Sequence, residues 1–187
     1  MARLQNLFAL LAALILLSGP AAAEIELFGS DPMFSAIRAQ NLPEVEALAI
    51  RGESLEVRGL EDRTPIIYAA LLGNPDIIDI LVKNKARVDH RDKLGNTALF
   101  YASNRGDLDS MQVLLEARAE PNLENRQGMT PIMTAASKGH VNAVQMLLDN
   151  KADAARRDYT GRTAMMWAEW NRQPAVVVLL RNAGVRE

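Results

Sequence analysis

The feature that most constrains the fold is a set of residues that recur every 33 positions. Threonine, alanine and leucine recur at this spacing, and so do two separate series of glycine. The members of these five ladders are Thr64, Thr97, Thr130 and Thr163; Ala36, Ala69, Ala102, Ala135 and Ala168; Leu48, Leu81, Leu114, Leu147 and Leu180; Gly73, Gly106 and Gly139; and Gly95, Gly128 and Gly161. Such a period indicates one small structural unit stacked repeatedly, each copy contacting its neighbours. The sequence therefore predicts an elongated solenoid.

The spacing inside each unit predicts two short helices. Each ladder threonine can cap a first helix, and Pro65 and Pro131 follow at the first helical position, where a missing N–H costs nothing. In the second helix Ile78, Leu81 and Val82 share one apolar face at helical spacing. The glycine nine residues after a ladder threonine suits the turn that ends a helix. The predicted fold class is an all-α solenoid.

The unit is written most fully as NRQGMTPIMTAASKGHVNAVQMLLDNKAD over 125–153 and as DKLGNTALFYASNRGDLDSMQVLLEARAE over 92–120. This pattern of a turn, a T-P-L-x-x-A-A-x-x-G first helix and a second helix ending in L-L resembles the ankyrin repeat. The resemblance covers about 31–187. It implies stacked helix pairs joined by hairpin loops, and a protein that binds other proteins without catalysing a reaction. The D-x-x-G motifs at Asp92–Gly95 and Asp158–Gly161 predict turns at the tips of these hairpins.

Five units follow from the ladders. They are an N-terminal cap (31–63), three full repeats (64–96, 97–129 and 130–162) and a truncated C-terminal cap (163–187). In the last unit Arg172 stands at the position of the ladder glycine. The polar second helix of the first unit can face water, as terminal repeats of a solenoid require. We expect residues 24–30 to be a loose leader.

The first 23 residues have the pattern of a secretory signal peptide. Arg3 lies ahead of an 11-residue apolar run over 7–17, and Ala21-Ala22-Ala23 forms a small-residue cleavage site. A membrane-spanning helix needs about 20 apolar residues, so a retained anchor is the less favoured alternative. Cleavage before Glu24 would release a periplasmic protein with no remaining membrane contact.

Composition excludes several function classes. The chain has 187 residues, 49% of them hydrophobic but only 5% aromatic, with no cysteine and a net charge of −2. These values exclude a disordered chain, a disulfide scaffold and a thiolate metal site, and they disfavour nucleic-acid binding. His90 and His140 lie on different repeats with no second ligand at metal spacing, and no catalytic motif is present. We expect no enzyme activity, no cofactor and no bound metal.

The resemblance implies that a partner protein binds the fingers, which are the hairpin loops 57–63, 90–96, 123–129 and 156–162, and the inner faces of the first helices, which line a groove. All five Tyr and Trp residues fall on this predicted surface, and these residue types dominate interface hot spots. The alternative is that the rings pack between repeats. The predicted partner-binding residues are Tyr68, Leu71, Leu72, Tyr101, Asn104, Arg105, Arg126, Tyr159, Trp167 and Trp170.

Two further features of this surface come from the sequence. The fingers carry eight basic and five acidic residues, which suits an acidic protein partner, although scattered solvated charge is an equal alternative. The ankyrin consensus also has a histidine one position before each groove residue. That position is occupied here by Ile67, Phe100, Met133 and Met166. We therefore expect apolar packing to substitute for the hydrogen bond between finger and helix.

The expected function is therefore that of an exported protein-binding module, acting as a monomer. One hypothesis is an accessory or protective factor for an envelope enzyme, because exported bacterial ankyrin proteins of this kind are associated with oxidative-stress enzymes such as catalase. The other is an immunity or inhibitor protein that blocks a toxin or hydrolase active site.

Overall fold

The protein is an all-α solenoid, as predicted. The computed structural model describes residues 31–52 and 55–185, and within these ranges the chain forms ten α-helices and one 3-10 turn, with no strand. The predicted signal peptide (1–23) and leader (24–30) lie outside the described residues. None of the helices in the described part is both long enough and apolar enough to cross a membrane.

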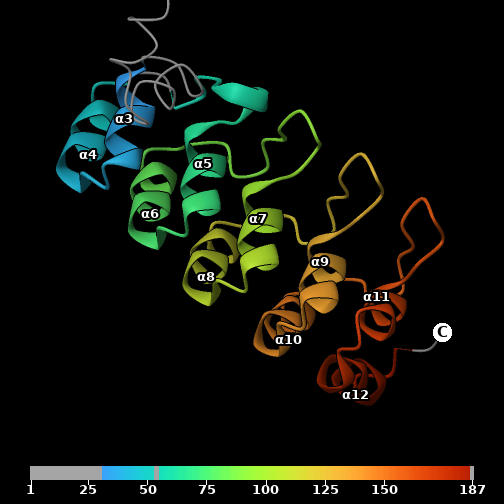
Figure 1. Cartoon of the computed structure of the whole chain (residues 1–187). Coiled ribbons are helices and arrows are strands. Elements are labelled where there is room, and N and C mark those ends of the chain that lie inside the picture. Colours follow the sequence, from blue (N-terminus) through green and yellow to red (C-terminus); the bar gives the residue numbers. More distant parts are fainter. Residues whose placement is uncertain (1–30, 53–54, 186–187) are drawn as a thin grey trace, which may run out of the picture.

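The helices form two parallel rows, and the fingers project from one side of the stack (Figure 1). The inner row contains α3 (Pro32–Arg38), α5 (Pro65–Leu72), α7 (Ala98–Arg105), α9 (Pro131–Lys138) and α11 (Ala164–Trp170). The outer row contains α4 (Leu42–Ile50), α6 (Pro75–Lys83), α8 (Leu108–Glu116), α10 (Val141–Asp149) and α12 (Pro174–Asn182). The 3-10 turn η1 (Leu60–Asp62) lies in the first finger.

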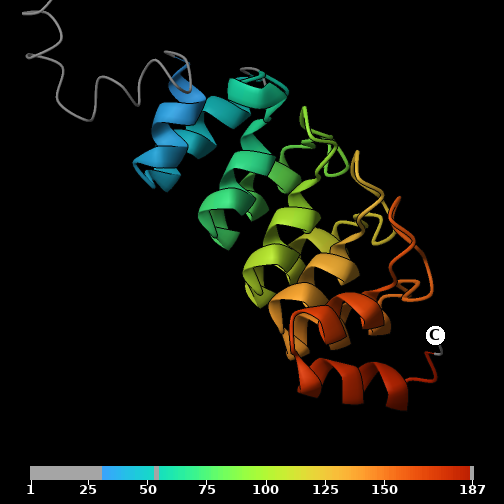
Figure 2. The ribbon, with the colours of Figure 1, turned by 45° about the vertical axis from the view of Figure 1, so that its right-hand side comes forward.

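Each helix packs against its pair and against the next helix of its own row. For example, α9 contacts α10 within its repeat and both α7 and α11 in the neighbouring repeats. Successive pairs are rotated slightly, so the stack follows an arc (Figure 2). The five helix pairs therefore share one continuous core, in which each repeat buries apolar side chains against its neighbours.

The first helices begin in two different ways. The Thr97 and Thr163 hydroxyls accept hydrogen bonds from the N–H groups of Phe100 and Met166, at 3.2 and 3.3 Å, which confirms the predicted cap. The prediction is wrong for the threonines that start α5 and α9, whose side chains make no capping hydrogen bond. These two helices have proline at the first position, and its fixed φ already favours the helical turn.

The core is built from small and aliphatic side chains. All the ladder alanines and leucines are buried. The four ladder alanines from Ala69 to Ala168 are each 0% exposed. Small alanines let neighbouring inner helices approach closely, while the leucines fill the space between outer helices. This packing explains how a chain with few aromatic residues builds a continuous core.

The last repeat carries charged residues at positions that are apolar in the preceding repeat. Glu169 and Arg181 are exposed, whereas Ala136 and Leu148, one period earlier, are buried and half-buried. Arg172 replaces a ladder glycine but keeps its left-handed backbone, with φ of 57°. The turn is therefore kept, while two charged side chains replace apolar ones on α11 and α12, beside exposed Val178.

Candidate functional site: the fingers and the groove

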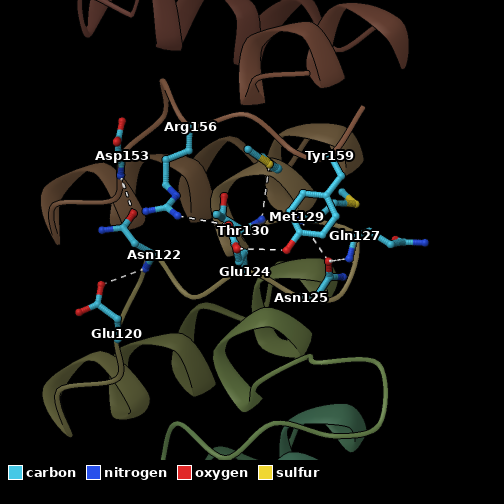
Figure 3. Close-up of polar contacts among 11 residues, drawn as sticks. Glu120, Asn122, Glu124, Asn125, Gln127, Met129, Thr130, Asp153, Arg156 and Tyr159 are labelled. Carbon is cyan, nitrogen blue, oxygen red and sulfur yellow. Dashed lines mark hydrogen bonds and ion pairs between the residues drawn. The ribbon is translucent and has the colours of Figure 1, made fainter. Parts of the chain in front are cut away.

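The three C-terminal fingers share one turn geometry. The side-chain Oδ1 of Asp92 accepts hydrogen bonds from the N–H groups of Leu94 and Asn96, each at 2.9 Å. Asp158 binds the N–H groups two and four positions ahead in the same way, and so does Asn125 (Figure 3). The predicted D-x-x-G turns are confirmed, and asparagine performs the same role in the third finger.

Neighbouring fingers are joined by backbone hydrogen bonds at their tips. The N–H of Lys93 donates to the carbonyl of Glu61 at 2.8 Å, and the N–H of Arg126 donates to that of Leu94 at 3.0 Å. The N–H of Tyr159 donates to the carbonyl of Gln127 at 3.0 Å. The four finger tips consequently form one linked row, so the side chains they carry project from a fixed backbone.

Two aromatic side chains fasten fingers to helices. The Tyr101 hydroxyl donates to Asp92 Oδ2 at 2.6 Å, and the Trp167 indole N–H donates to Asp158 Oδ2 at 2.8 Å. The expectation that apolar packing alone replaces the consensus histidine is thus wrong in these two repeats. Tyr101 and Trp167, one residue further along each helix, make the hydrogen bond instead, because their long aromatic side chains reach the turn carboxylates.

These contacts shift two pKa values. Burial and the hydrogen bond to Asp92 raise the pKa of the Tyr101 hydroxyl. Burial alone would raise the pKa of Asp158, but hydrogen bonds from the Thr160 hydroxyl, the Arg162 N–H and Trp167 outweigh it and lower that pKa below its usual value. The carboxylate of Asp158 is therefore held in its charged form by the turn that it organises.

The predicted exposure of Tyr68 and Tyr101 is wrong. Tyr68 is 3% exposed and packs edge-on against Phe34, with ring centroids 5.6 Å apart. Tyr101 is 8% exposed and also accepts a hydrogen bond from the Asn96 side chain at 3.1 Å. Phe34 of the preceding unit packs against Tyr68, and finger residues bind the Tyr101 hydroxyl. These two buried tyrosines therefore stabilise the stack and offer little surface to a partner.

Three predicted aromatic or apolar residues are exposed. Tyr159 and Trp170 are each 69% exposed, and Leu72 is 37% exposed. The guanidinium of Arg162 lies over two rings, 5.0 Å from the centroid of Trp170 and 5.3 Å from that of half-buried Trp167. This cation–π contact orients Trp170 while leaving most of its surface available for binding.

The remaining predicted residues have mixed roles. Leu71 is half-buried, and half-buried Asn104 accepts a hydrogen bond from the Thr134 hydroxyl at 2.9 Å. Arg105 is exposed, and its guanidinium donates to the Leu71 carbonyl at 3.2 Å, which joins two repeats. Arg126 is exposed at the tip of its finger. The structure thus brings Arg126 and Tyr159 together on the fingers, while Leu72, Arg105 and Trp170 lie at the C-terminal ends of α5, α7 and α11.

The finger surface is more basic than the count of residues indicates. Asp92 and Asp158 are only 4% and 5% exposed, because their oxygens are occupied by the turns and by the aromatic donors. The basic side chains of Arg91 and Lys93 on the second finger and of Arg126 on the third are exposed. A count of finger acids treats all five as equally exposed, whereas the D-x-x-G spacing is the sequence signal that Asp92 and Asp158 are buried.

The described residues contain no cluster of His, Asp and Glu that could hold a metal ion. His140 precedes α10, and its Nε2 lies 3.1 Å from the Asn104 carbonyl oxygen of the previous repeat. His90 lies 3.8 Å from a carboxylate oxygen of Glu56, and burial followed by the nearby Arg58 lowers its pKa. Both histidines therefore make structural contacts between neighbouring units.

Comparison with known proteins agrees with this architecture. The family described as ankyrin repeats (3 copies) matches residues 2–92, 33–125 and 99–186. No curated protein matches the chain. Ankyrin repeats generally mediate protein–protein interaction, and members of the family are typically non-enzymatic. From the repeat pattern, the stacked helix pairs and these three matches, the chain belongs to the ankyrin-repeat family.

Proposed function

We propose that the protein is an exported, non-catalytic module that holds another protein in the bacterial periplasm with its groove and fingers. The observation that carries this proposal is a set of exposed apolar and aromatic side chains on the inner helices and the fingers: Leu72, Trp170 and Tyr159. Exposed Trp and Tyr side chains on a rigid scaffold contribute strongly to binding because little conformational entropy is lost when they are buried. The signal-peptide pattern of residues 1–23 supports the location.

The partner class that we propose is an envelope or oxidative-stress enzyme, with this protein as its accessory factor. Support comes from the resemblance to exported bacterial ankyrin proteins and from the absence of catalytic motifs in the sequence. An accessory factor of this kind leaves its partner enzyme active in the complex. Deletion of the gene should then sensitise cells to peroxide, and an unchanged peroxide response would count against this role.

The test of binding is a pull-down from periplasmic extract with wild type and with Leu72→Ser/Trp170→Ala. We expect the variant to remain folded by circular dichroism and to lose the partner, because both side chains lie on the surface. Ile50→Ser is the matched control, since Ile50 is 70% exposed but lies on α4, outside the groove. Equal capture by all three proteins would contradict the proposed surface.

Activity of the captured protein decides between the two roles. An accessory factor leaves its partner active or protects it during heating or oxidation. An inhibitor or immunity protein abolishes the activity of the partner when the purified components are mixed. Mass spectrometry of the exported protein should show an N-terminus at Glu24, and an intact Met1 in the membrane fraction would contradict the proposed export of a released protein.

A further inference from the structure

A cleft of about 360 Å³ lies between the finger tips and is lined by residues from all four fingers. Its charged and aromatic lining residues include Asp62, Arg91, Lys93, Glu124, Arg126 and Tyr159. Because the tips are joined by backbone hydrogen bonds, the cleft exists before any partner binds. A site that is already ordered loses little entropy on binding.

The acidic residues around the cleft are already engaged by other groups. Glu124 accepts a hydrogen bond from the Tyr159 hydroxyl through one oxygen and pairs with Arg156 through the other, both at 3.2 Å (Figure 3). Asp92 is buried with its oxygens bound by the turn and by Tyr101. Asp62 lies 4.0 Å from Arg58 in an exposed and therefore weak ion pair.

The basic residues around the cleft are not engaged in this way. The side chains of Arg91, Lys93 and Arg126 are exposed, and the structure gives them no hydrogen bond or ion pair among the residues it describes. Three like charges beside one cleft repel each other, so an anion bound between them would be stabilised. The cleft thus offers two guanidinium groups and one ammonium group with free hydrogen-bond donors.

We infer that this cleft binds carboxylate side chains of an acidic, extended segment of a partner protein. Guanidinium groups bind carboxylates through paired, charge-assisted hydrogen bonds, and the exposed face of Tyr159 provides an adjacent surface for an apolar side chain. The inference rests on the proposed function, because it names the chemistry of the partner that the fingers recognise.

A continuous polyanion fits the cleft less well than a peptide. Within the described part of the chain, only three basic side chains line the cleft, whereas a nucleic acid gains its affinity by pairing many phosphates along its length. The whole chain also carries a net charge of −2, which opposes binding to nucleic acid or to an anionic membrane. A short peptide segment can place isolated carboxylates on these three cations.

The test uses the isolated full chain and a rhodamine-labelled, end-blocked octapeptide of alternating Glu and Gly, monitored by fluorescence anisotropy. The matched probe contains Gln in place of Glu. We expect the Glu peptide to bind, with a Kd that rises with salt, and the Gln peptide not to bind. Arg91→Gln/Arg126→Gln should raise the Kd at least about tenfold.

The control variant is Arg51→Gln/Arg118→Gln, which changes the net charge equally at exposed positions outside the cleft. It should bind the Glu peptide almost as wild type does. Equal binding of the Glu and Gln peptides, or equal losses in the two double variants, would overturn the inference. Tighter binding of an oligothymidylate or of phosphatidylglycerol vesicles at the same arginines would replace the peptide with that ligand and also overturn it.

Failure of this inference can be told apart from failure of the proposed function. If the pull-down captures a partner equally well with wild type and with Arg91→Gln/Arg126→Gln, the protein-binding function stands and the acidic segment is wrong. If the peptide binds in the cleft but the groove variant does not affect capture from the extract, the cleft assignment stands and the proposed groove surface is wrong.

Discussion

Tyr101 and Trp167 occupy the same position in repeats two periods apart, yet the two rings have different surroundings. Each donates a hydrogen bond to the aspartate that organises its finger. Tyr101 lies inside the stack, with another repeat on each side, and is buried. Trp167 lies in the last repeat and is half-buried. Both rings have an arginine above them, Arg63 over Tyr101 at 5.6 Å and Arg162 over Trp167 at 5.3 Å, so the difference lies in burial. The position of a residue within the 33-residue unit therefore determines the hydrogen bond from its ring to the finger aspartate. The exposure of the ring depends instead on whether another repeat packs beside it.

The largest expected effect is the difference in the free energy of unfolding between variants of a buried and of an exposed aromatic residue. Tyr101→Ala should lower the free energy of unfolding by about 3–5 kcal/mol, because it leaves a cavity and removes the donor to Asp92. Trp170→Ala should change it by no more than about 0.5 kcal/mol, since the ring is mostly in solvent. Urea denaturation followed by circular dichroism measures both values, and similar losses for the two variants would contradict the contrast.

The next comparison concerns two finger glycines with the same backbone. Gly128 and Gly161 have φ of 77° and 81°, so alanine is strained at both positions by about 1–2 kcal/mol. A Cβ on Gly128 would lie 2.7 Å from the backbone nitrogen of Tyr159, whereas one on Gly161 meets nothing within 4 Å. Gly128→Ala should therefore cost about 1–3 kcal/mol more than Gly161→Ala, because the next finger must move away.

Thermal unfolding of the two alanine variants provides this measurement, with Gly161→Ala as the matched control for backbone strain. The amide hydrogen of Tyr159, which donates to the Gln127 carbonyl, should also exchange faster with deuterium in Gly128→Ala. Equal stabilities would mean that the close approach of the fingers does not hold the row of tips together.

A smaller effect isolates the hydrogen bond that fastens the finger. Tyr101→Phe keeps the ring and removes the hydroxyl, while Arg63 stays 3.7 Å from the freed Asp92 oxygen and keeps that charge partly compensated. We expect a loss of about 1 kcal/mol in the free energy of unfolding, a typical net value for one hydrogen bond. A loss as large as that of Tyr101→Ala would mean that the ring itself contributes little.

The sequence predicted most of the fold because the repeat encodes it locally. The ladders located the helix pairs, the D-x-x-G spacing located finger turns, and Arg172 marked a changed terminal repeat. The exposure of the groove rings was not predictable in this way. Whether Tyr68 faces solvent depends on Phe34 and on neighbouring repeats, which are contacts in space that no single unit of 33 residues specifies.

The candidate site was predicted in part for the same reason. Tyr159, Trp170 and Leu72 were placed correctly on the surface, since finger tips and the ends of first helices have few neighbours. The cationic cleft between the fingers was missed, although Arg126 was among the predicted residues. Its existence depends on which finger acids are engaged by turns and ion pairs, and on the joining of tips from different repeats.

The smallest expected effect is a pH dependence of the last finger. The pKa of Asp158 in the folded protein is lower than its usual value, so its contribution to stability is complete above that usual value and is lost as the pH falls through the lowered pKa. The chain has only two tryptophans, so Trp170→Phe leaves Trp167 as the sole tryptophan, and excitation at its absorption edge reports on the indole bound to this carboxylate. Its emission should change in a step below about pH 4.

The control for this step is Asp158→Asn in the same Trp170→Phe background. Asn125 organises its own finger with the same pair of backbone hydrogen bonds, so an asparagine at 158 can keep the turn. It cannot become charged, and the step in Trp167 emission should disappear while the fold is retained at neutral pH. If the step persists in the asparagine variant, another group titrates there, and the carboxylate of Asp158 is not what couples the last finger to its helix.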